Sequence, residues 1–487
     1  MVNTFVVPSP LCPSFSAFSA VLKGQNSAKA GRRWDVIVIG GGPAGAQAAR
    51  HLAAGGARVA LLDRPPPGGK VCGGCLTAPA WDELGRPEAL QATPVREAVF
   101  EWSPLPGEDG RGGPLAAPGA PAPACRASPR RSGAPPGRSR AAIQVRGDAV
   151  LVDRDRLDAY LVARAEEAGA HLFRTRARQV RRSASGWTVE TEGPTFAAPF
   201  LVGADGCRSI VRRAVAGPWR PSDVVLAVGV TAEWPDLAPG VCRPGMVRAL
   251  FPAARRGRQD AARHGYAYVF GRSDGAVLGY WRRGSGGREV LAGLWGLCER
   301  WLCFCSKTAS PLTPPLFRGG EREVMGQPVC GSGPSPAEAD CGPRRRPLPH
   351  PRGRMMPCLA SGGAATRATG GADWMLVGDA AGHVNPVTGE GIRYALRGGR
   401  LAAEAILDGR PRSYGDRWEA DFGGFLRWGS RLMEFCEWTT VLRRLIGRAE
   451  RSDRGARALA DLAFARRDYA GLYFKGAAAY ALDALLG

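Results

Sequence analysis

The chain contains very little lysine. Of its 66 basic residues only five are lysines, so 61 are arginines, and 44 acidic residues leave a formal net charge of +22. The arginines are spread among Gly, Ala and Pro and do not gather on one element, and no aromatic-interleaved basic motif of a nucleic-acid reader is present. The charge therefore reflects composition, and we expect no nucleic-acid partner.

Long apolar runs are also missing. Charged residues, Gly or Pro interrupt every apolar stretch before it reaches the roughly 18 to 20 residues that a membrane-spanning helix needs. We therefore expect any membrane contact to be peripheral. The 487 residues, of which 45% are hydrophobic, still suffice for two or three packed units.

The cysteines do not form the paired framework of a secreted protein. Their number, 13, is odd and their spacing is irregular, which favours a reducing compartment. The pairs Cys72/Cys75 and Cys303/Cys305 each lack the second ligand pair that a structural zinc site requires. We expect no bound metal.

Three segments are poor candidates for a core. Residues 1–33 contain no Asp or Glu, several serines and a terminal Arg32-Arg33. This pattern is typical of a transit peptide to a plastid or another organelle, and equally of a disordered N-terminus on a cytoplasmic protein. Residues 104–142 and 306–371 are dominated by Pro, Gly, Ala and Arg, which predicts low-complexity inserts.

A strand, a glycine turn and a helix follow one another from Trp34. The sequence W-D-V-I-V-I-G-G-G-P-A-G places an apolar strand before Gly40, Gly42 and Gly45, with a helix expected from Ala46 to Ala54. Gly40 permits the tight turn, Gly42 lets a pyrophosphate approach the backbone, and Gly45 allows close helix packing. The helix N-terminus then faces the phosphate charge, so the segment predicts a dinucleotide site.

A second strand, 58–62, ends at Asp63, at the distance where an acidic residue accepts hydrogen bonds from a ribose diol. With this carboxylate the unit is complete. It does not by itself separate FAD from NAD.

Two later segments make that distinction. Residues 201–209 read L-V-G-A-D-G-C-R-S, and residues 375–391 read M-L-V-G-D-A-A-G-H-V-N-P-V-T-G-E-G; each follows a short apolar strand. Both resemble the Asp-Gly and Gly-Asp motifs of flavoprotein monooxygenases and geranylgeranyl reductases, in which the chain returns twice to the flavin. Arg154, in D-R-D-R-L-D, resembles a family arginine near the cofactor, although a solvated surface residue is the alternative.

The resemblance implies specific roles. Asp379 is expected to accept a hydrogen bond from the ribityl chain, and the helix opened by Gly389 and Glu390 is expected to point its positive end at the flavin ring. The implied FAD-binding residues are Gly40, Gly42, Pro43, Ala44, Gly45, Asp63, Arg64, Arg154, Asp205, Gly206, Gly378, Asp379, Ala380, Pro386, Gly389, Glu390, Gly391 and Ile392. His383 is left open between approach to the flavin and a hydrogen bond within the loop.

The segment most informative about the reaction is Lys70–Leu76, K-V-C-G-G-C-L. It resembles the K-x-C-G-G segment of geranylgeranyl reductases, which implies that Cys72 lies near the flavin and substrate and that Gly73 and Gly74 allow close approach. A glycine loop with two inert thiols is the alternative. The family's G-Y-x-W-x-F-P stretch corresponds to residues 265–271, G-Y-A-Y-V-F-G, where Tyr268 replaces the tryptophan that lines the substrate cavity.

The resemblance implies an α/β fold. We expect a Rossmann-like FAD-binding domain of the glutathione reductase and hydroxybenzoate hydroxylase type, an inserted antiparallel-sheet substrate domain and a C-terminal helical region. The expected ranges are 34–103, 143–218 and 372–410 for the FAD-binding domain, 219–305 for the substrate sheet and 411–487 for the helices.

Three functions remain open on the sequence. The first is reduction of C=C bonds in an isoprenoid chain by reduced FAD, with NAD(P)H as the implied electron donor and a hydrophobic, prenylated small molecule as substrate. The second is an FAD-dependent monooxygenase that hydroxylates or epoxidises an organic substrate. The third is a flavin-binding protein without activity.

Overall fold

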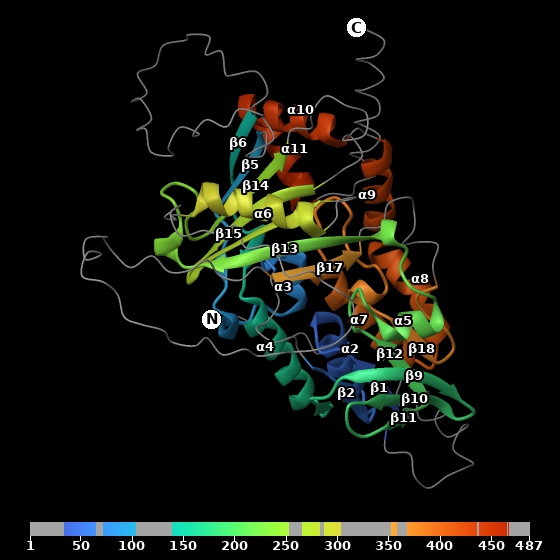
Figure 1. Cartoon of the computed structure of the whole chain (residues 1–487). Helices are drawn as coiled ribbons and strands as arrows, with labels where there is room; N and C mark the ends of the chain where they lie inside the picture. The colour runs from blue at the N-terminus through green and yellow to red at the C-terminus, as the bar shows by residue number, and fades with distance from the viewer. Residues whose placement is uncertain are drawn as a thin grey trace, which may run out of the picture.

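The computed structural model describes residues 34–64, 72–103, 139–252, 265–282, 287–302, 352–357, 368–435, 438–464 and 466. Two layered units share this part of the chain, one around a parallel sheet and one around a larger, mainly antiparallel sheet (Figure 1). Residues 1–33, Lys70, Cys303 and Cys305 lie outside the described residues, and so do the predictions made for them.

The parallel sheet has five strands in the order β18-β12-β1-β2-β8. Their bounds are Trp374–Leu376, Phe200–Gly203, Val36–Ile39, Val59–Leu62 and His171–Phe173. β1 alternates between two cores because successive side chains of a strand point to opposite faces. Val36 and Val38 pack against helices α2 (Pro43–Ala54) and α7 (Ile392–Leu407), whereas Ile37 and Ile39 pack under a three-stranded sheet. That sheet contains β9 (Ala177–Ser183), β10 (Gly186–Thr191) and β11 (Phe196–Ala198).

The second unit is a seven-stranded sheet in the order β17-β13-β16-β15-β14-β5-β6. The strands are Arg352–Pro357, Val224–Ala232, Gly275–Arg282, Gly265–Arg272, Met246–Pro252, Glu97–Ser103 and Ser139–Gln144. Helix α6 (Gly287–Trp301) covers one face, where Val269 and Leu278 meet Leu294. Helices α10 (Trp438–Arg451) and α11 (Asp453–Ala463) pack against β5 and β6.

The remaining elements connect these layers. The small sheet has the order β3-β7-β4, with bounds Cys75–Thr77, Ala149–Leu151 and Thr93–Pro94. The other helices are α3 (Ala78–Glu83), α4 (Arg154–Glu167), α5 (Ile210–Val215), α8 (Tyr414–Trp418) and α9 (Gly424–Phe435). The short helical turns are Glu88–Leu90, Pro221–Asp223, Trp234–Asp236, Gly378–Ala380, Pro411–Ser413 and the π-helical Glu419–Gly423. Among these described helices, none combines the length and apolar character needed to cross a bilayer.

The expected α/β architecture with a C-terminal helical region is confirmed, and four details are corrected. The first two concern the low-complexity inserts: the segment expected over 104–142 overlaps β6, which pairs with β5, and the segment expected over 306–371 contains β17, which pairs with β13. β5 and β6 belong to the seven-stranded sheet and not to the unit around the parallel sheet. The large sheet is not purely antiparallel, because β14 and β5 run parallel.

Helix α2 begins at Pro43 instead of Ala46. Proline is favoured in the first turn because its missing N–H is one that the helix leaves unpaired there, and its fixed φ suits the helix. The strand expected over 58–62 begins one residue later, at Val59.

Candidate functional site

The glycine turn after β1 is held by close backbone contacts. Gly40 has φ +102°, and a Cβ there would collide with the Ala204 carbonyl. Gly45 has no room for a Cβ against the Gly40 carbonyl, so α2 approaches the end of β1 closely. The N-cap residue of α2, Gly42, offers no side-chain hydrogen bond to the first amides of the helix. Those amides remain available to an anion, as the fingerprint predicts.

Asp63 lies directly beyond β2 and touches the turn. Its Oδ1 accepts a hydrogen bond from the Gly41 amide at 2.7 Å, and its Oδ2 accepts one from Arg174 at 3.2 Å. A Cβ on Gly41 would lie 2.6 Å from the Asp63 Cγ, a close approach that the sequence reasoning missed. The carboxylate is therefore fixed beside the dinucleotide turn with lone pairs to spare.

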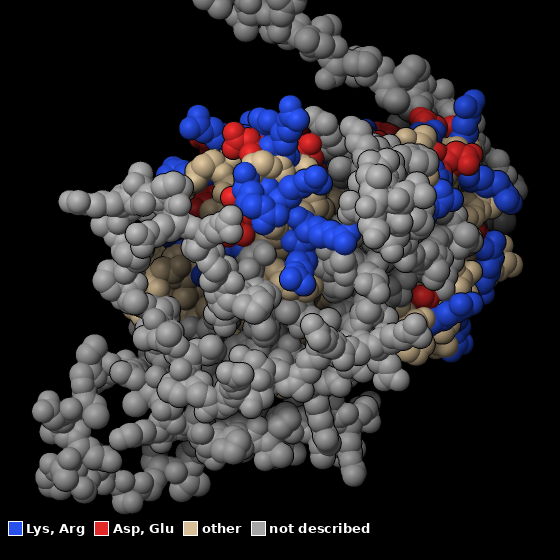
Figure 2. Space-filling view, turned by 90° about the horizontal axis from the view of Figure 1, so that it is seen from above, with Lys and Arg blue, Asp and Glu red and all other residues tan. Residues whose placement is uncertain are grey.

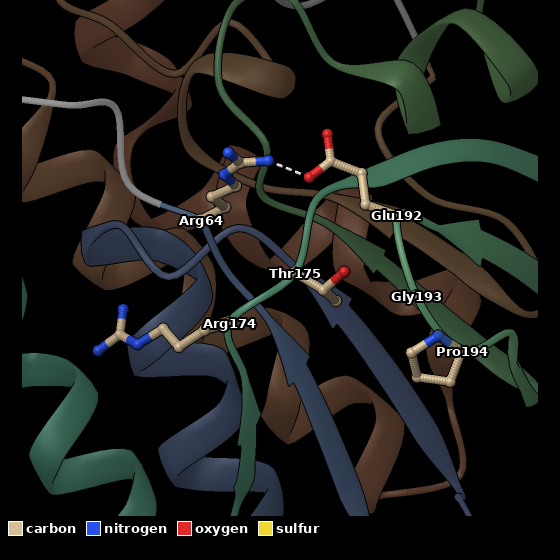
Figure 3. Close-up of a pocket in the computed structure, with 6 residues that line it drawn as sticks. All are labelled: Arg64, Arg174, Thr175, Glu192, Gly193 and Pro194. Atoms are coloured by element: carbon tan, nitrogen blue, oxygen red, sulfur yellow. Dashed lines mark hydrogen bonds and ion pairs between the residues drawn. The ribbon is translucent and has the colours of Figure 1, made fainter.

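Arg64 points away from this turn. It forms an ion pair with Glu192, and the two side chains extend toward one another at a cavity of about 510 Å³ that Arg174 also lines, with its side chain extending in another direction (Figure 3). The other residues lining this cavity are Thr175, Gly193 and Pro194. The ion pair thus joins Arg64 to the connection between β10 and β11.

The Asp-Gly segment lies at the end of β12. Asp205 accepts a hydrogen bond through Oδ2 from the Ile210 amide at 2.6 Å, while its buried Oδ1 has no partner among the described residues. Burial raises the pKa of this carboxyl group. Gly206 has φ +75° with open space around it, so its glycine serves the backbone conformation alone.

The Gly-Asp segment meets the same edge from β18. Gly378 has φ +60°, and a Cβ there would lie 2.9 Å from the Ala44 Cβ of α2. The Ala380 carbonyl accepts a hydrogen bond from Arg212 at 3.1 Å, and Arg212 stacks over the Trp219 ring at 3.4 Å. Arg212 therefore ties the two later motifs together, a role that nothing in the sequence indicated.

A tight loop leads from this segment into α7. The Asn385 Oδ1 accepts hydrogen bonds from the Val387 and Thr388 amides, which folds the loop around the buried Pro386. Asp379 lies next to the helix start, because a Cβ on Gly391 would be 3.6 Å from its Oδ1. Gly391 caps α7 without a side-chain hydrogen bond, and Ile392 is the first residue of the helix. A second uncapped helix N-terminus thus lies beside Asp379.

His383 packs against aromatic rings instead of forming a hydrogen bond within its loop. Its ring packs between Trp418 and Phe422, at centroid distances of 4.6 and 5.0 Å, and neither ring nitrogen has a partner among the described residues. Burial lowers the pKa of His383 to about 3. It is a neutral, packed side chain.

Arg154 is buried, which excludes the solvated alternative. It forms an ion pair with Asp158 at 2.9 Å at the start of α4. Burial works against its charge, but Asp158 and a hydrogen bond with Cys72 raise the pKa of Arg154 above its usual value. The arginine therefore carries its charge to the loop that contains Cys72.

A second cavity, of about 220 Å³, brings the remaining predicted residues together. Its wall includes Cys72, Gly73 and Gly74 from one loop, Gly389–Ile392 from another and Tyr268 from β15. Helices α10 and α11 close it with Leu442, Leu459 and Leu462. Residues distant in the sequence thus line one mainly apolar space.

The aromatic wall of this cavity follows from strand alternation. Tyr266, Tyr268 and Phe270 occupy every second position of β15 and face the cavity, whereas Ala267 and Val269 face α6. Tyr266 and Phe270 were not singled out from the sequence, although the same period-two pattern that contains Tyr268 identifies them. Tyr266 also donates a hydrogen bond to the Thr388 carbonyl at 2.7 Å.

Packing within the protein requires glycine at positions 73 and 74. A Cβ on Gly73 would collide with the Phe270 ring, and one on Gly74, at φ +66°, would collide with the Val152 carbonyl. Protein atoms already occupy both directions. The close approach therefore joins this loop to β15 and to the residue before α4.

The turn after β1 and the residues that follow β2, β12 and β18 lie at one edge of the parallel sheet, which we call the cofactor edge. Its residues fit FAD. A dinucleotide needs amides for its pyrophosphate and acceptors for its sugar hydroxyls. The chain offers two uncapped helix N-termini, the Asp63 carboxylate and a buried Asp205 oxygen that has no partner among the described residues. The second cavity adjoins one of those helix starts, at Gly391 and Ile392.

Comparisons with known proteins agree with an FAD site. Residues 34–107 match the family model of the pyridine nucleotide-disulphide oxidoreductases. A menaquinone reductase of Mycolicibacterium smegmatis is 28% identical over 399 residues, 79% of each chain. A chloroplastic geranylgeranyl diphosphate reductase of Oryza sativa is 26% identical over 83% of this chain and 75% of its own.

Among solved structures, a geranylgeranyl bacteriochlorophyll reductase-like protein of Thermoplasma acidophilum shares the fold. It has a TM-score of 0.59 at 18% identity, covering 88% of this chain and 96% of its own. A flavin-dependent brominase matches with a TM-score of 0.51 at 16% identity, covering 89% and 100%.

The fold, the motifs and these relatives together define an FAD-dependent oxidoreductase, and so an enzyme. The resemblance to the geranylgeranyl reductases is confirmed, with relatives at modest identity along most of the chain.

Proposed function

We propose that this enzyme saturates carbon–carbon double bonds of an isoprenoid chain with reduced FAD. The observation that carries the proposal is the second cavity, where the Cys72–Gly74 loop, the Gly389–Ile392 loop and the aromatic face of β15 meet. An apolar, aromatic-lined space with few polar groups suits a prenyl chain. The names of the relatives, which include geranylgeranyl and digeranylgeranylglycerophospholipid reductases, support the same substrate class.

In this proposal the cofactor edge of the parallel sheet holds FAD. The amides at the start of α2 would bind the pyrophosphate and those at the start of α7 would face the flavin ring, while Asp63 and Asp379 would accept hydrogen bonds from the ribose and ribityl hydroxyls. Gly40, Gly42 and Gly378 keep the backbone free of side chains there. FAD, once reduced by NAD(P)H, supplies the hydride.

The cavity residues orient the substrate. The rings of Tyr266, Tyr268 and Phe270 lie against one another along β15, with centroid distances of 6.1 and 4.9 Å between neighbours. They present a continuous apolar wall that excludes water from the double bond. Arg154 holds the Cys72 loop at the cavity edge.

The test is an anaerobic assay of the flavin-loaded enzyme with NADPH or NADH and a panel of prenylated and aromatic compounds, with a parallel aerobic run. Mass spectrometry separates the reactions. A product that gains two hydrogens without O2 supports the reductase. A product that gains oxygen only in the aerobic run contradicts it and supports a monooxygenase.

A prenylated substrate resides in a membrane, so we also propose a second partner, an anionic membrane surface. The outer face of α10 and α11 carries the exposed residues Arg443, Arg444, Arg448, Arg451, Arg454 and Arg457, against Glu450 and Asp453. Among the described residues, no ion pair is found for Arg443, Arg448, Arg451, Arg454 or Arg457. Figure 2, which looks down on this end of the molecule, shows basic side chains gathered there.

The inner face of the same two helices lines the cavity through Leu442 and Leu459. We therefore propose that α10 and α11 rest on anionic lipid, where each arginine near the surface contributes about 1 kcal/mol. Co-sedimentation with phosphatidylglycerol vesicles is expected to weaken when Arg448, Arg451 and Arg454 become Gln. The matched triple change at Arg178, Arg181 and Arg182, which are ion-paired on β9, is expected to leave it intact. Equal loss in both variants contradicts the assignment.

A further inference from the structure

One carboxyl group lies on the wall of the substrate cavity. Glu390 precedes α7, and its Oε1 accepts a hydrogen bond from the Thr77 hydroxyl of β3 at 2.6 Å. The two residues are 313 positions apart in the chain. The hydrogen bond from Thr77 goes to Oε1, and none joins Oε2 to the residues that the structure describes. Thr77 therefore fixes the orientation of the carboxyl group and leaves Oε2 for another partner.

The groups around Glu390 do not neutralise it with an ion pair. Arg393, one turn along α7, lies over the Tyr394 and Phe425 rings, and no ion pair joins it to Glu390 in the described part of the chain. Burial raises the pKa of Cys75 of β3, and the nearby Glu390 charge raises it further. Tyr266 has its hydroxyl proton engaged with the Thr388 carbonyl.

These surroundings shift the carboxyl group toward its protonated form. Burial raises the pKa of Glu390, while the Thr77 hydrogen bond and the Arg393 charge act in the opposite direction. Burial also raises the pKa of Tyr266 to about 12. A neutral carboxyl group in an apolar cavity is a stronger acid than the phenol or thiol groups beside it.

We propose that Glu390 is the proton donor of the reaction, which rests on the reductase function proposed above. Saturation of a C=C bond breaks its π bond and forms two C–H bonds. One carbon takes the hydride with its electron pair, and the other takes the proton from Glu390 Oε2, whose O–H bond breaks. The alkene is reduced and the flavin is oxidised. The carboxylate regains a proton from solvent, and Thr77 is its positioning residue.

The experiment compares Glu390→Gln and Glu390→Asp with Glu404→Gln, a matched change on α7 at a carboxylate paired with Arg400. Flavin content and the rate of flavin reduction by NADPH are measured first, so that saturation is compared per bound, reduced flavin; both are expected to match the wild type in Glu404→Gln. Prenyl saturation is expected to fall about 100-fold or more in Glu390→Gln, since general acids contribute 10²- to 10⁴-fold. We expect Glu390→Asp to retain part of the activity and Glu404→Gln all of it.

A second measurement does not depend on turnover. Infrared spectroscopy of the wild-type holoenzyme at pH 7 is expected to show the C=O stretch of a protonated carboxyl group, sensitive to D2O. That band should vanish in Glu390→Gln and persist in Glu404→Gln. A wild-type spectrum without it overturns the proposal.

The outcomes separate the two proposals. If wild-type enzyme saturates prenyl chains and Glu390→Gln does so at a comparable rate, the donor assignment alone is overturned. If Cys72→Ala abolishes saturation while Glu390→Gln does not, the thiol is the donor instead. If the wild type saturates none of the compounds, the reductase function is overturned and the donor assignment with it.

Discussion

The Tyr266 hydroxyl donates a hydrogen bond to the Thr388 carbonyl at 2.7 Å, and this bond joins the large sheet to the loop that opens α7. The same loop carries Gly389 and Glu390. The bond therefore fixes the cavity wall relative to the start of α7, the helix proposed to face the cofactor. A Cβ on Gly389 would lie 3.8 Å from the Tyr266 oxygen. The sheet thus positions the loop.

Tyr266→Phe is expected to loosen this junction. Loss of one hydrogen bond from a buried carbonyl costs about 1 kcal/mol. We expect a lower thermal midpoint and a few-fold weaker FAD affinity, measured by calorimetry. Tyr160→Phe on α4 is the control, because the Tyr160 hydroxyl makes no hydrogen bond with the described residues. If both variants behave like the wild type, the bond does not position the loop.

Gly73→Ala is expected to damage the cavity. Its Cβ would collide with the Phe270 ring, so either the ring or the Cys72 loop must move. We expect loss of substrate turnover and a destabilisation of about 1 to 3 kcal/mol, typical of overpacking. Phe270→Leu in the same chain should restore part of the stability, whereas Gly424→Ala, where the space is open, should cost nothing. Failure of Phe270→Leu to rescue would exclude this contact as the cause.

Asp63→Ala tests the cofactor edge. Hydrogen bonds to a charged group are worth about 1.5 to 3 kcal/mol, so we expect FAD affinity to fall about 10- to 100-fold. Asp82→Ala removes an exposed carboxylate paired with Arg86 and should leave the affinity unchanged. Equal affinities of the two variants would place the ribose elsewhere.

The Thr77–Glu390 hydrogen bond predicts a pH effect. Because this bond lowers the pKa of Glu390, Thr77→Val should raise it. Arg393, Cys75 and Tyr266 remain as the other groups around the carboxyl. If protonated Glu390 is required, the decline of kcat at high pH should move to higher pH in Thr77→Val and stay in place in Thr77→Ser. A merely structural Thr77 would change the rate without moving the profile.

His383 predicts how stability depends on pH. Its pKa is lowered from 6.5 to about 3 in the folded chain, so the unfolded chain binds the proton more readily. This contribution is fully present above pH 6.5 and is lost as the pH falls below it, at up to about 1.4 kcal/mol per pH unit. Urea unfolding of the wild type and His383→Leu from pH 7 to pH 4 measures it. Parallel slopes in the two proteins would contradict the assignment.

The local parts of the fold were predictable because they depend on neighbours in the sequence. The run from Val36 through Gly45 predicts strand, turn and helix by itself, and the structure has all three. β6 was missed because S-R-A-A-I-Q has little β propensity and follows a low-complexity segment; its pairing with β5 decides its conformation. The parallel pairing of β14 with β5 joins distant segments that no local pattern links.

The candidate site divides in the same way. The motifs predicted which segments form the site. The period-two pattern of aromatic residues in β15, extended from Tyr268 in both directions, also contains Tyr266 and Phe270. The burial of Arg154 and the bond between Thr77 and Glu390 depend on tertiary packing. An arginine-rich chain also hides a buried arginine among its many exposed ones. Only the folded chain distinguishes them.

The most direct measurement is anaerobic reoxidation of the reduced, flavin-loaded enzyme after a prenylated compound is added. The account predicts that the oxidised flavin absorption returns without O2, in step with a product that has gained two hydrogens. A flavin that stays reduced with every prenylated compound and reoxidises only when O2 is admitted would contradict it.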